Sequence, residues 1–146
     1  MAKKGVVFQL TAEERDPYSF EFTVGRHKLL MSRTMKSEDL PVSGFCPVDF
    51  LMAGIAGCVG MTIRDRLEAR GIAFSGLRLE AAGTRTEDWE KNGLNSVRTK
   101  VFVTTDAPLE EVEAAVADAE ASCTVRSTIA DPPAFETEVV LEKPEA

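Results

Sequence analysis

The sequence has few of the residues that metal, disulfide and nucleic-acid sites require. Among its 146 residues it has one histidine and three cysteines, and no two cysteines have the CxxC spacing. An odd set of cysteines without that spacing argues against a disulfide framework and against a zinc ribbon. We therefore expect free thiols in a reducing compartment, and neither a metal nor another cofactor.

Basic runs and long hydrophobic runs are also missing. The formal net charge is -7, from 24 acidic and 17 basic residues, and no Lys or Arg run is interleaved with aromatic residues as a nucleic-acid surface requires. The apolar run Val6–Leu10 is too short for a signal peptide, and no later stretch approaches a membrane span. We therefore expect a cytoplasmic protein with no nucleic-acid or membrane partner.

Motifs of several enzyme classes are absent. The sequence has no GxSxG turn, no GxGxxG and no P-loop. His27 is the only histidine, so any Cys–His pair or Ser–His–Asp arrangement would have to use it. Because it stands between Arg26 and Lys28 in a predicted hairpin, we expect an exposed strand residue rather than a catalytic one.

The residues that are present predict an α+β fold. Short apolar or alternating runs predict an N-terminal β-meander with strands at Val6–Leu10, Tyr18–Thr23 and Lys28–Met31. A long loop over residues 33–46 follows, and then a helix from Pro47 to Arg70 that Gly71 ends. The first half of this helix is apolar nearly all round, so we expect it to be buried on every side.

Three glycines interrupt that apolar half, and each costs on the order of 1 kcal/mol relative to alanine. They are Gly54, Gly57 and Gly60. We interpret the row as the contact for a second helix, of this chain or of a second subunit. The alternative is a strained helix without a special partner.

The rest of the chain predicts a hairpin, a second helix and a closing strand. Residues 77–81 and 97–103 alternate around a turn that contains Asn92 and Gly93. Asp106 is positioned to cap a helix whose apolar stripe runs from Leu109 to Cys123. Residues 135–141 alternate as a C-terminal strand, and no repeat or linker divides the chain. We therefore expect a single domain over residues 1–146.

Local physics favours none of the three cysteines decisively. Cys58 lies mid-helix among apolar residues and Cys123 ends an apolar stripe, where a thiol is normally an inert small hydrophobe. Cys46 directly precedes Pro47, where the helix N-terminus favours a thiolate, although a plain loop cysteine fits as well. Cys46 is therefore a rival nucleophile.

Two segments resemble the OsmC/Ohr family. Residues 47–62, PVDFLMAGIAGCVGMT, resemble its central helix, in which Pro, an acidic residue, an apolar run and small residues precede a cysteine. Residues 121–126, ASCTVR, are similar to the family's Cys-Pro-Val segment. The order of elements agrees over residues 5–142. The resemblance implies an OsmC/Ohr-like fold, an intertwined homodimer with central helices packed across the two-fold axis, a peroxidatic Cys58 and a resolving Cys123.

The implied activity is reduction of small organic hydroperoxides by a two-cysteine cycle, which an external dithiol restores without metal or flavin. Family members with this activity hold the first cysteine as a thiolate with an arginine and a glutamate. Here Val48 follows the proline and the nearest acid is Asp49. The candidates for the arginine are Arg26, Arg33 and Arg126.

Asp49 cannot reach Cys58 along one straight helix. Nine residues separate them, so at ~1.5 Å and ~100° per residue they lie on opposite faces, about 13 Å apart. Asp49 would therefore act through an arginine or from a partner subunit. The alternative is that it only answers the helix dipole.

Two other functions fit the same residues. The first is a non-enzymatic OsmC-like protein that binds an apolar ligand or partner, with Cys58 as packing. The second is a general thiol redox or disulfide-exchange protein that uses Cys46.

Overall fold

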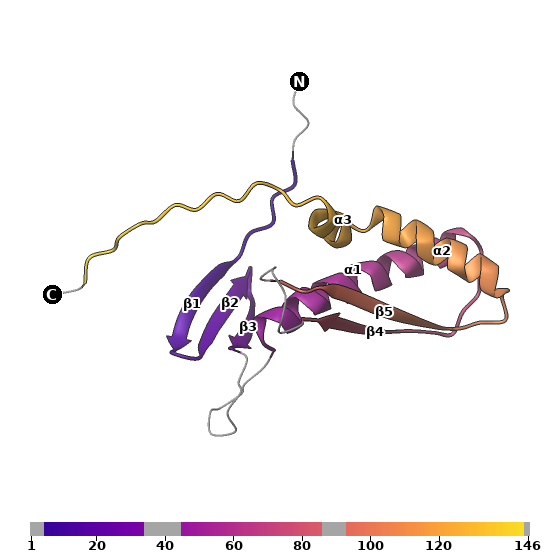
Figure 1. The fold of residues 1–146 in the computed structure, drawn as a ribbon, viewed down its shortest axis with the longest axis horizontal. Coiled ribbons are helices and arrows are strands. Elements are labelled where there is room, and N and C mark those ends of the chain that lie inside the picture. Colours follow the sequence, from indigo (N-terminus) through magenta and orange to yellow (C-terminus); the bar gives the residue numbers. More distant parts are fainter. Residues whose placement is uncertain (1–4, 34–44, 86–92, 145–146) are drawn as a thin grey trace. The chain divides into compact units, whose positions relative to one another are not determined.

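The computed structural model describes residues 5–33, 45–85 and 93–144. The chain divides into two compact units, residues 1–54 with 81–98 and residues 55–80 with 99–146, and the following description takes each by itself. The predicted α+β class is confirmed. The elements in chain order are β1 (Thr11–Asp16), β2 (Ser19–Val24), β3 (His27–Ser32), α1 (Pro47–Ala69), β4 (Gly76–Thr84), β5 (Ser96–Thr104), α2 (Leu109–Ser122) and α3 (Thr124–Ala130) (Figure 1). The single domain over residues 1–146 stays a prediction.

In the first unit, β1, β2 and β3 form an antiparallel meander. Gly25 takes a φ of 58° in the predicted turn between β2 and β3, a conformation that glycine adopts at no steric cost. The predicted second and third strands are confirmed. The first was wrong, since β1 is Thr11–Asp16 and residues 5–10 form no strand.

The physical reason lies in the turn between β1 and β2. The Asp16 carboxylate accepts a hydrogen bond from the Tyr18 N–H at 2.8 Å and another from the Ser19 hydroxyl at 2.8 Å. This side-chain turn fixes the end of β1 at Asp16. The strand that pairs with β2 then reaches back only to Thr11, and among the described residues no strand lies opposite Val6–Leu10.

Helix α1 confirms the predicted helix and its glycine stop. Gly71 has a φ of 68°. Its N–H donates to the Glu68 carbonyl at 3.0 Å, and the Ile72 N–H donates to the Leu67 carbonyl at 3.0 Å. This pair of bonds is the Schellman motif, which satisfies carbonyls that the end of a helix leaves free.

Two expectations for α1 need correction. By length and composition the helix is apolar enough to cross a membrane, with a hydropathy of 1.2, contrary to the expectation that no stretch approaches a span. Its second half nevertheless packs in the protein core, where Ile63 and Leu67 are fully buried. The first half is not buried on every side in the single chain, because Val48 and Leu51 are 43% and 44% exposed.

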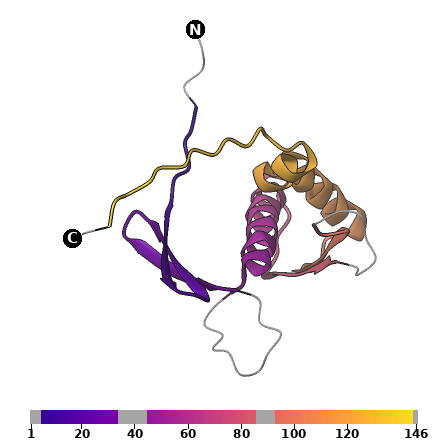
Figure 2. The same ribbon diagram turned by 60° about the vertical axis from the view of Figure 1, so that its left-hand side comes forward.

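The core of the second unit lies between α1, α2 and the β4–β5 hairpin. Its buried residues are Val59, Ile63, Leu67, Ile72, Val112, Ala115, Ala119 and Cys123. Apolar side chains of β4 and β5, such as Leu79 and Val101, pack against it. Figure 2 shows α2 beside the second half of α1. The predicted hairpin is confirmed, although Asn92 of its turn lies outside the described residues, as does most of the predicted loop over residues 33–46.

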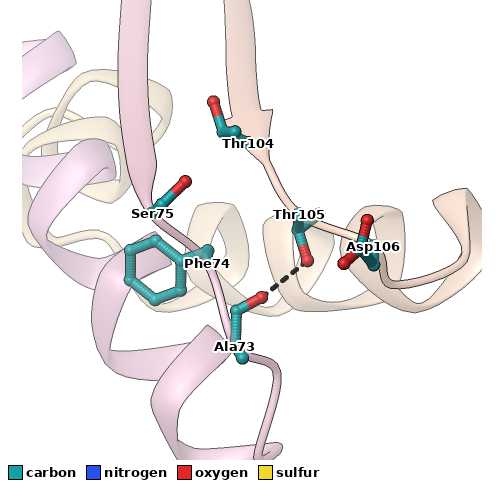
Figure 3. Close-up of a pocket in the computed structure, with 6 residues that line it drawn as sticks. All are labelled: Ala73, Phe74, Ser75, Thr104, Thr105 and Asp106. Carbon is teal, nitrogen blue, oxygen red and sulfur yellow. Dashed lines mark hydrogen bonds between the residues drawn. The ribbon is translucent and has the colours of Figure 1, made fainter.

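Helix α2 begins later than predicted, and Asp106 does not cap it. The N-cap is Pro108, which makes no side-chain hydrogen bond. The Thr105 hydroxyl organises the preceding turn instead, because it donates to the Ala73 carbonyl at 2.6 Å and accepts from the Ala107 N–H at 3.1 Å. Figure 3 shows the bond between Thr105 and Ala73. Both residues line a hollow of about 380 Å³, as does Asp106.

The predicted C-terminal strand forms no strand in the single chain. Residues 132–144 are extended and exposed (Figure 1), and Phe135 and Leu141 are 88% and 90% exposed. A strand needs a neighbour to satisfy its backbone N–H and carbonyl groups, and none of the strands in the described residues pairs with the segment. The alternating residues 135–141 are therefore typical of a strand, but the described residues offer them no strand to pair with.

Candidate functional site

Two cysteines that are far apart in the sequence meet in the second unit. Cys58 lies on α1. Cys123 lies between α2 and α3, where it is the C-cap of α2 and the N-cap of α3. Cys123 is fully buried, whereas Cys58 is half-buried and packs against the same core. Both are free thiols. The structure thus brings together the two cysteines that the family resemblance singled out.

The surroundings of Cys58 favour its thiolate. The backbone N–H of Val125 lowers the pKa of Cys58 most, followed by the thiol of Cys123. Partial burial raises this pKa, and the N–H of Thr124 and the hydroxyl of Thr62 lower it further. Hydrogen bonds to the charged form outweigh desolvation, so the net shift is downward.

The surroundings of Cys123 favour its protonated thiol. Burial in the core raises the pKa of Cys123, and Cys58 raises it further, against the lowering effect of the Arg126 and Val125 N–H groups. The Arg126 N–H donates to the Cys123 sulfur at 3.5 Å. The pair therefore consists of one sulfur poised to lose its proton and a neighbour that keeps its own.

The break between α2 and α3 creates this geometry. Cys123 has an extended backbone, with φ -73° and ψ 117°, so the chain leaves α2 there and starts the short helix α3. The N–H groups of Thr124 and Val125 belong to the first turn of α3, where no carbonyl of that helix accepts them. They are free to donate to Cys58, which is why they lower its pKa. The sequence interpretation missed α3 and these donors.

Thr62 was also missed, although its spacing gave a signal. It lies four residues after Cys58, and helical residues at that spacing lie on the same face. Its hydroxyl donates to the Cys58 carbonyl at 2.8 Å, and it is one of the groups that lower the pKa of Cys58.

Two of the three candidate arginines have other described contacts, and the third is exposed. The Arg126 guanidinium pairs with Glu120 at 4.0 Å, and only its backbone reaches Cys123. Arg33 lies over the ring of Tyr18, 5.4 Å from its centroid, and Arg26 is exposed in the turn between β2 and β3. Arg26 and Arg33 belong to the first unit, whereas both cysteines belong to the second.

Asp49 lies at the start of α1 and contacts Cys46. The Cys46 N–H donates to its carboxylate at 3.0 Å, and this bond, with the Cys46 thiol, lowers the pKa of Asp49. A side chain in the first turn that bonds the cap residue's N–H stabilises the helix start. Within one chain Asp49 therefore stabilises the N-terminal end of α1. Among the described ranges, no group of three or more His, Cys, Asp or Glu side chains could hold a metal ion.

The chain belongs to the OsmC-like protein family, which matches residues 38–138. No curated protein matches it. The fold is similar to that of an OsmC-like protein from Mycoplasma pneumoniae, with a TM-score of 0.77, 19% identity, and 90% of this chain and 91% of that chain covered.

Two further similar structures carry more specific descriptions. One is an organic hydroperoxide resistance protein OsmC from Legionella pneumophila, with a TM-score of 0.62, 21% identity and coverage of 87% and 93%. The other is the organic hydroperoxide resistance protein OhrB of Bacillus subtilis, with a TM-score of 0.61, 19% identity and coverage of 85% and 93%. These likenesses confirm the OsmC/Ohr-like fold.

Proposed function

We propose that the protein is a thiol-dependent peroxidase that reduces organic hydroperoxides, with Cys58 as the peroxidatic and Cys123 as the resolving cysteine. The observation that carries the proposal is the contact between two thiols whose pKa values move in opposite directions. A peroxidatic cysteine must be a thiolate to attack the peroxide. A neighbouring thiol that is still protonated can supply the proton with which the sulfenic acid oxygen leaves as water.

The chemistry balances as a two-step cycle. The Cys58 thiolate attacks the distal peroxide oxygen; the S–O bond forms, the O–O bond breaks, and the alkoxide leaves and takes a proton as an alcohol. The Cys123 thiol then attacks the Cys58 sulfenic acid, which gives a disulfide and water. An external dithiol reopens the disulfide by exchange and is itself oxidised.

The core beside Cys58 favours an apolar substrate. Cys58 packs against the apolar core of the second unit. A fatty or aromatic hydroperoxide would therefore gain burial there that hydrogen peroxide does not. Two proteins of this fold are described as organic hydroperoxide resistance proteins, which supports the same class of substrate. A cycle that ends on external dithiols also fits the reducing cytoplasm, where we place the protein.

We also propose that the working form is an intertwined homodimer. Val48, Leu51 and Met61 of α1 are exposed in the single chain, Met61 by 73%. A side chain added at Gly57 would meet nothing within 4 Å. An apolar helix face with an open glycine fits a second copy of the helix packed closely against it.

The dimer gives roles to the remaining candidates. An antiparallel partner helix would bring its Asp49 toward the Cys58 of the first chain. The cation that supports the Cys58 thiolate is then one of Arg26, Arg33 and Arg126.

A turnover assay with cumene hydroperoxide and dithiothreitol, followed by mass spectrometry of the oxidised protein, tests the proposal. We expect turnover and a Cys58–Cys123 disulfide after one equivalent of peroxide. Oxidation confined to Cys46 would favour disulfide exchange instead. Absence of both turnover and cysteine oxidation would leave a binding protein as the better description.

A further inference from the structure

Helices α1 and α2 are joined by two matched contacts beside the cysteine pair. Arg66 donates to the Ser122 hydroxyl at 3.1 Å, and Arg70 donates to the Asp118 carboxylate at 3.2 Å. The two arginines are four residues apart, as are their two partners, so the contacts form an antiparallel ladder with one helical turn between its steps. The step that ends at Ser122 is the one next to Cys123.

Arg66 supplies what the end of α2 lacks. The last turn of α2 has no basic residue of its own, although the negative end of a helix favours a cation there. The Ser122 hydroxyl donates to the Asp118 carbonyl at 2.8 Å and accepts from Arg66. The guanidinium is thus tied through one hydroxyl to the last turn of α2, at the residue bonded covalently to Cys123.

We propose that Arg66 is a positioning residue for Cys123: its bond to Ser122 holds the end of α2 so that Cys123 stays within reach of Cys58. The inference rests on the proposed function and adds to it. Disulfide formation demands tight geometry, with Cα atoms about 4.4–6.8 Å apart and a restricted torsion. Packing buries Cys123 in the core, and the Arg66–Ser122 bond adds a directional contact from α1 at the junction itself.

The role lies chiefly in the second step of the cycle. Among the described residues, the groups that lower the pKa of Cys58 are Val125, Cys123, Thr124 and Thr62, and Arg66 is not one of them. Loss of Arg66 removes none of these groups, so we expect a smaller effect on attack on the peroxide than on the step that needs the Cys123 sulfur in bonding position. It should slow the condensation of the Cys58 sulfenic acid with Cys123, so that more sulfenic acid survives to be over-oxidised.

The test compares the full-length wild-type protein with four single variants. These are Arg66→Met, Ser122→Ala, Arg66→Lys and the control Arg70→Met. Stoichiometric cumene hydroperoxide starts a single turnover, and quenched samples are analysed by mass spectrometry for trapped sulfenic acid, sulfinic acid and disulfide. For Arg66→Met and Ser122→Ala we expect sulfenic acid formation to change little and disulfide formation to be roughly three- to tenfold slower, the range for one lost hydrogen bond. Arg66→Lys, whose ammonium also donates, should recover most of the rate.

Arg70→Met removes the other contact between the same helices and should resolve at the wild-type rate. Equal slowing in Arg70→Met, or wild-type resolution in Arg66→Met, would overturn the role of Arg66. A second readout separates this outcome from failure of the proposed function. In glutathione redox buffers without peroxide, Arg66→Met should shift the Cys58–Cys123 equilibrium toward the dithiol by roughly three- to tenfold. An unchanged equilibrium would overturn the inference even in a protein that shows no peroxidase activity.

Discussion

Cys58 and Cys123 shift each other's pKa, although Cys58 lies on α1 and Cys123 lies between α2 and α3. The pKa of Cys58 is lowered first by the Val125 N–H and then by the Cys123 thiol, while burial and then Cys58 raise the pKa of Cys123. The division of labour between the two sulfurs therefore comes from where α3 begins.

Replacing each cysteine by serine should separate the two steps. Cys58→Ser should abolish turnover, because it removes the thiol whose pKa the Val125 N–H and its neighbours lower. Cys123→Ser should leave a single slow turnover that ends in over-oxidised Cys58, since the resolving thiol is gone. Steady-state assays with dithiothreitol and mass spectrometry after a peroxide pulse check both. Sustained turnover in Cys58→Ser would contradict the assignment.

The pH dependence of alkylation should distinguish the two thiols. A lowered pKa means that Cys58 is ionised at pH values below the usual cysteine range near about 8.5, so iodoacetamide should label it first as pH rises. The raised pKa of Cys123 delays its labelling to higher pH. Peptide mapping of native protein labelled between pH 5 and about 10 measures both curves. Labelling of Cys123 before Cys58 would reverse the proposed roles.

Thr62→Val should weaken Cys58 as a nucleophile without changing the fold. The substitution keeps the shape of the side chain and removes a hydroxyl that lowers the pKa of Cys58. Alkylation of Cys58 near neutral pH should fall roughly two- to tenfold, as expected for one hydrogen bond. Thr128→Val is the matched control, because Thr128 makes the same bond to a carbonyl four residues earlier, at 2.7 Å, on α3. Equal effects of the two variants would assign the loss to the helices rather than to the sulfur.

Gly57→Leu should break the dimer and, with it, the fold. Within the chain a Cβ atom added at this position meets nothing within 4 Å, so the space beside Gly57 is open for a second copy of the helix. Gly57→Ala sharpens the test, since alanine should stabilise an isolated helix by about 1 kcal/mol but crowd a close helix crossing. Light scattering at micromolar concentration and thermal unfolding measure both effects. A stable wild-type monomer, or a Gly57→Ala protein of raised stability, would argue against the dimer.

Mixed dimers test whether Asp49 acts across the subunit interface. With Asp49→Ala in one subunit and Cys58→Ser in the other, a trans arrangement places both lesions at one site and leaves the second site intact. Such heterodimers should retain about half the wild-type rate. A fully inactive mixture would rule the trans arrangement out, because it would mean that Asp49 is needed by the Cys58 of its own chain.

The local role of Asp49 has its own pH signature. Its pKa is lowered in the folded chain by the Cys46 N–H, so its stabilising effect is present above the unfolded value of about 3.9. The effect is lost as the pH falls through the lowered folded value. Asp49→Asn should therefore be less stable than the wild type near neutral pH and equally stable in strong acid, as denaturant titrations at several pH values can show.

The elements that could be predicted from the sequence are those whose signals lie within a few neighbouring residues. The bounds of α1 follow from Pro47 in its first turn and from Gly71, whose positive φ closes the helix. Strands β2 and β3 follow from their alternation and from Gly25 between them. The β4–β5 hairpin follows from the alternation on either side of its turn.

The sequence also pointed to the relevant cysteines, but through resemblance to a family rather than through their local physics. Read alone, Cys58 and Cys123 are inert core thiols, and Cys46 is the more acidic candidate. In the structure the shifts that matter arise from α3 and from the contact between the two sulfurs. No pattern local to either cysteine contains that information.

By itself, then, the sequence determined the helix, the hairpins and the cysteines worth testing, because periodicity and capping act within one or two turns of chain. Tertiary structure decided the rest. It set where β1 starts, which residue begins α2, and that residues 132–144 pair with no strand in the part of the chain that the structure describes. Above all, it placed the Val125 N–H and Cys123 beside Cys58. These outcomes depend on contacts between residues distant in sequence, and only the packing of α1, α2 and α3 brings such residues together.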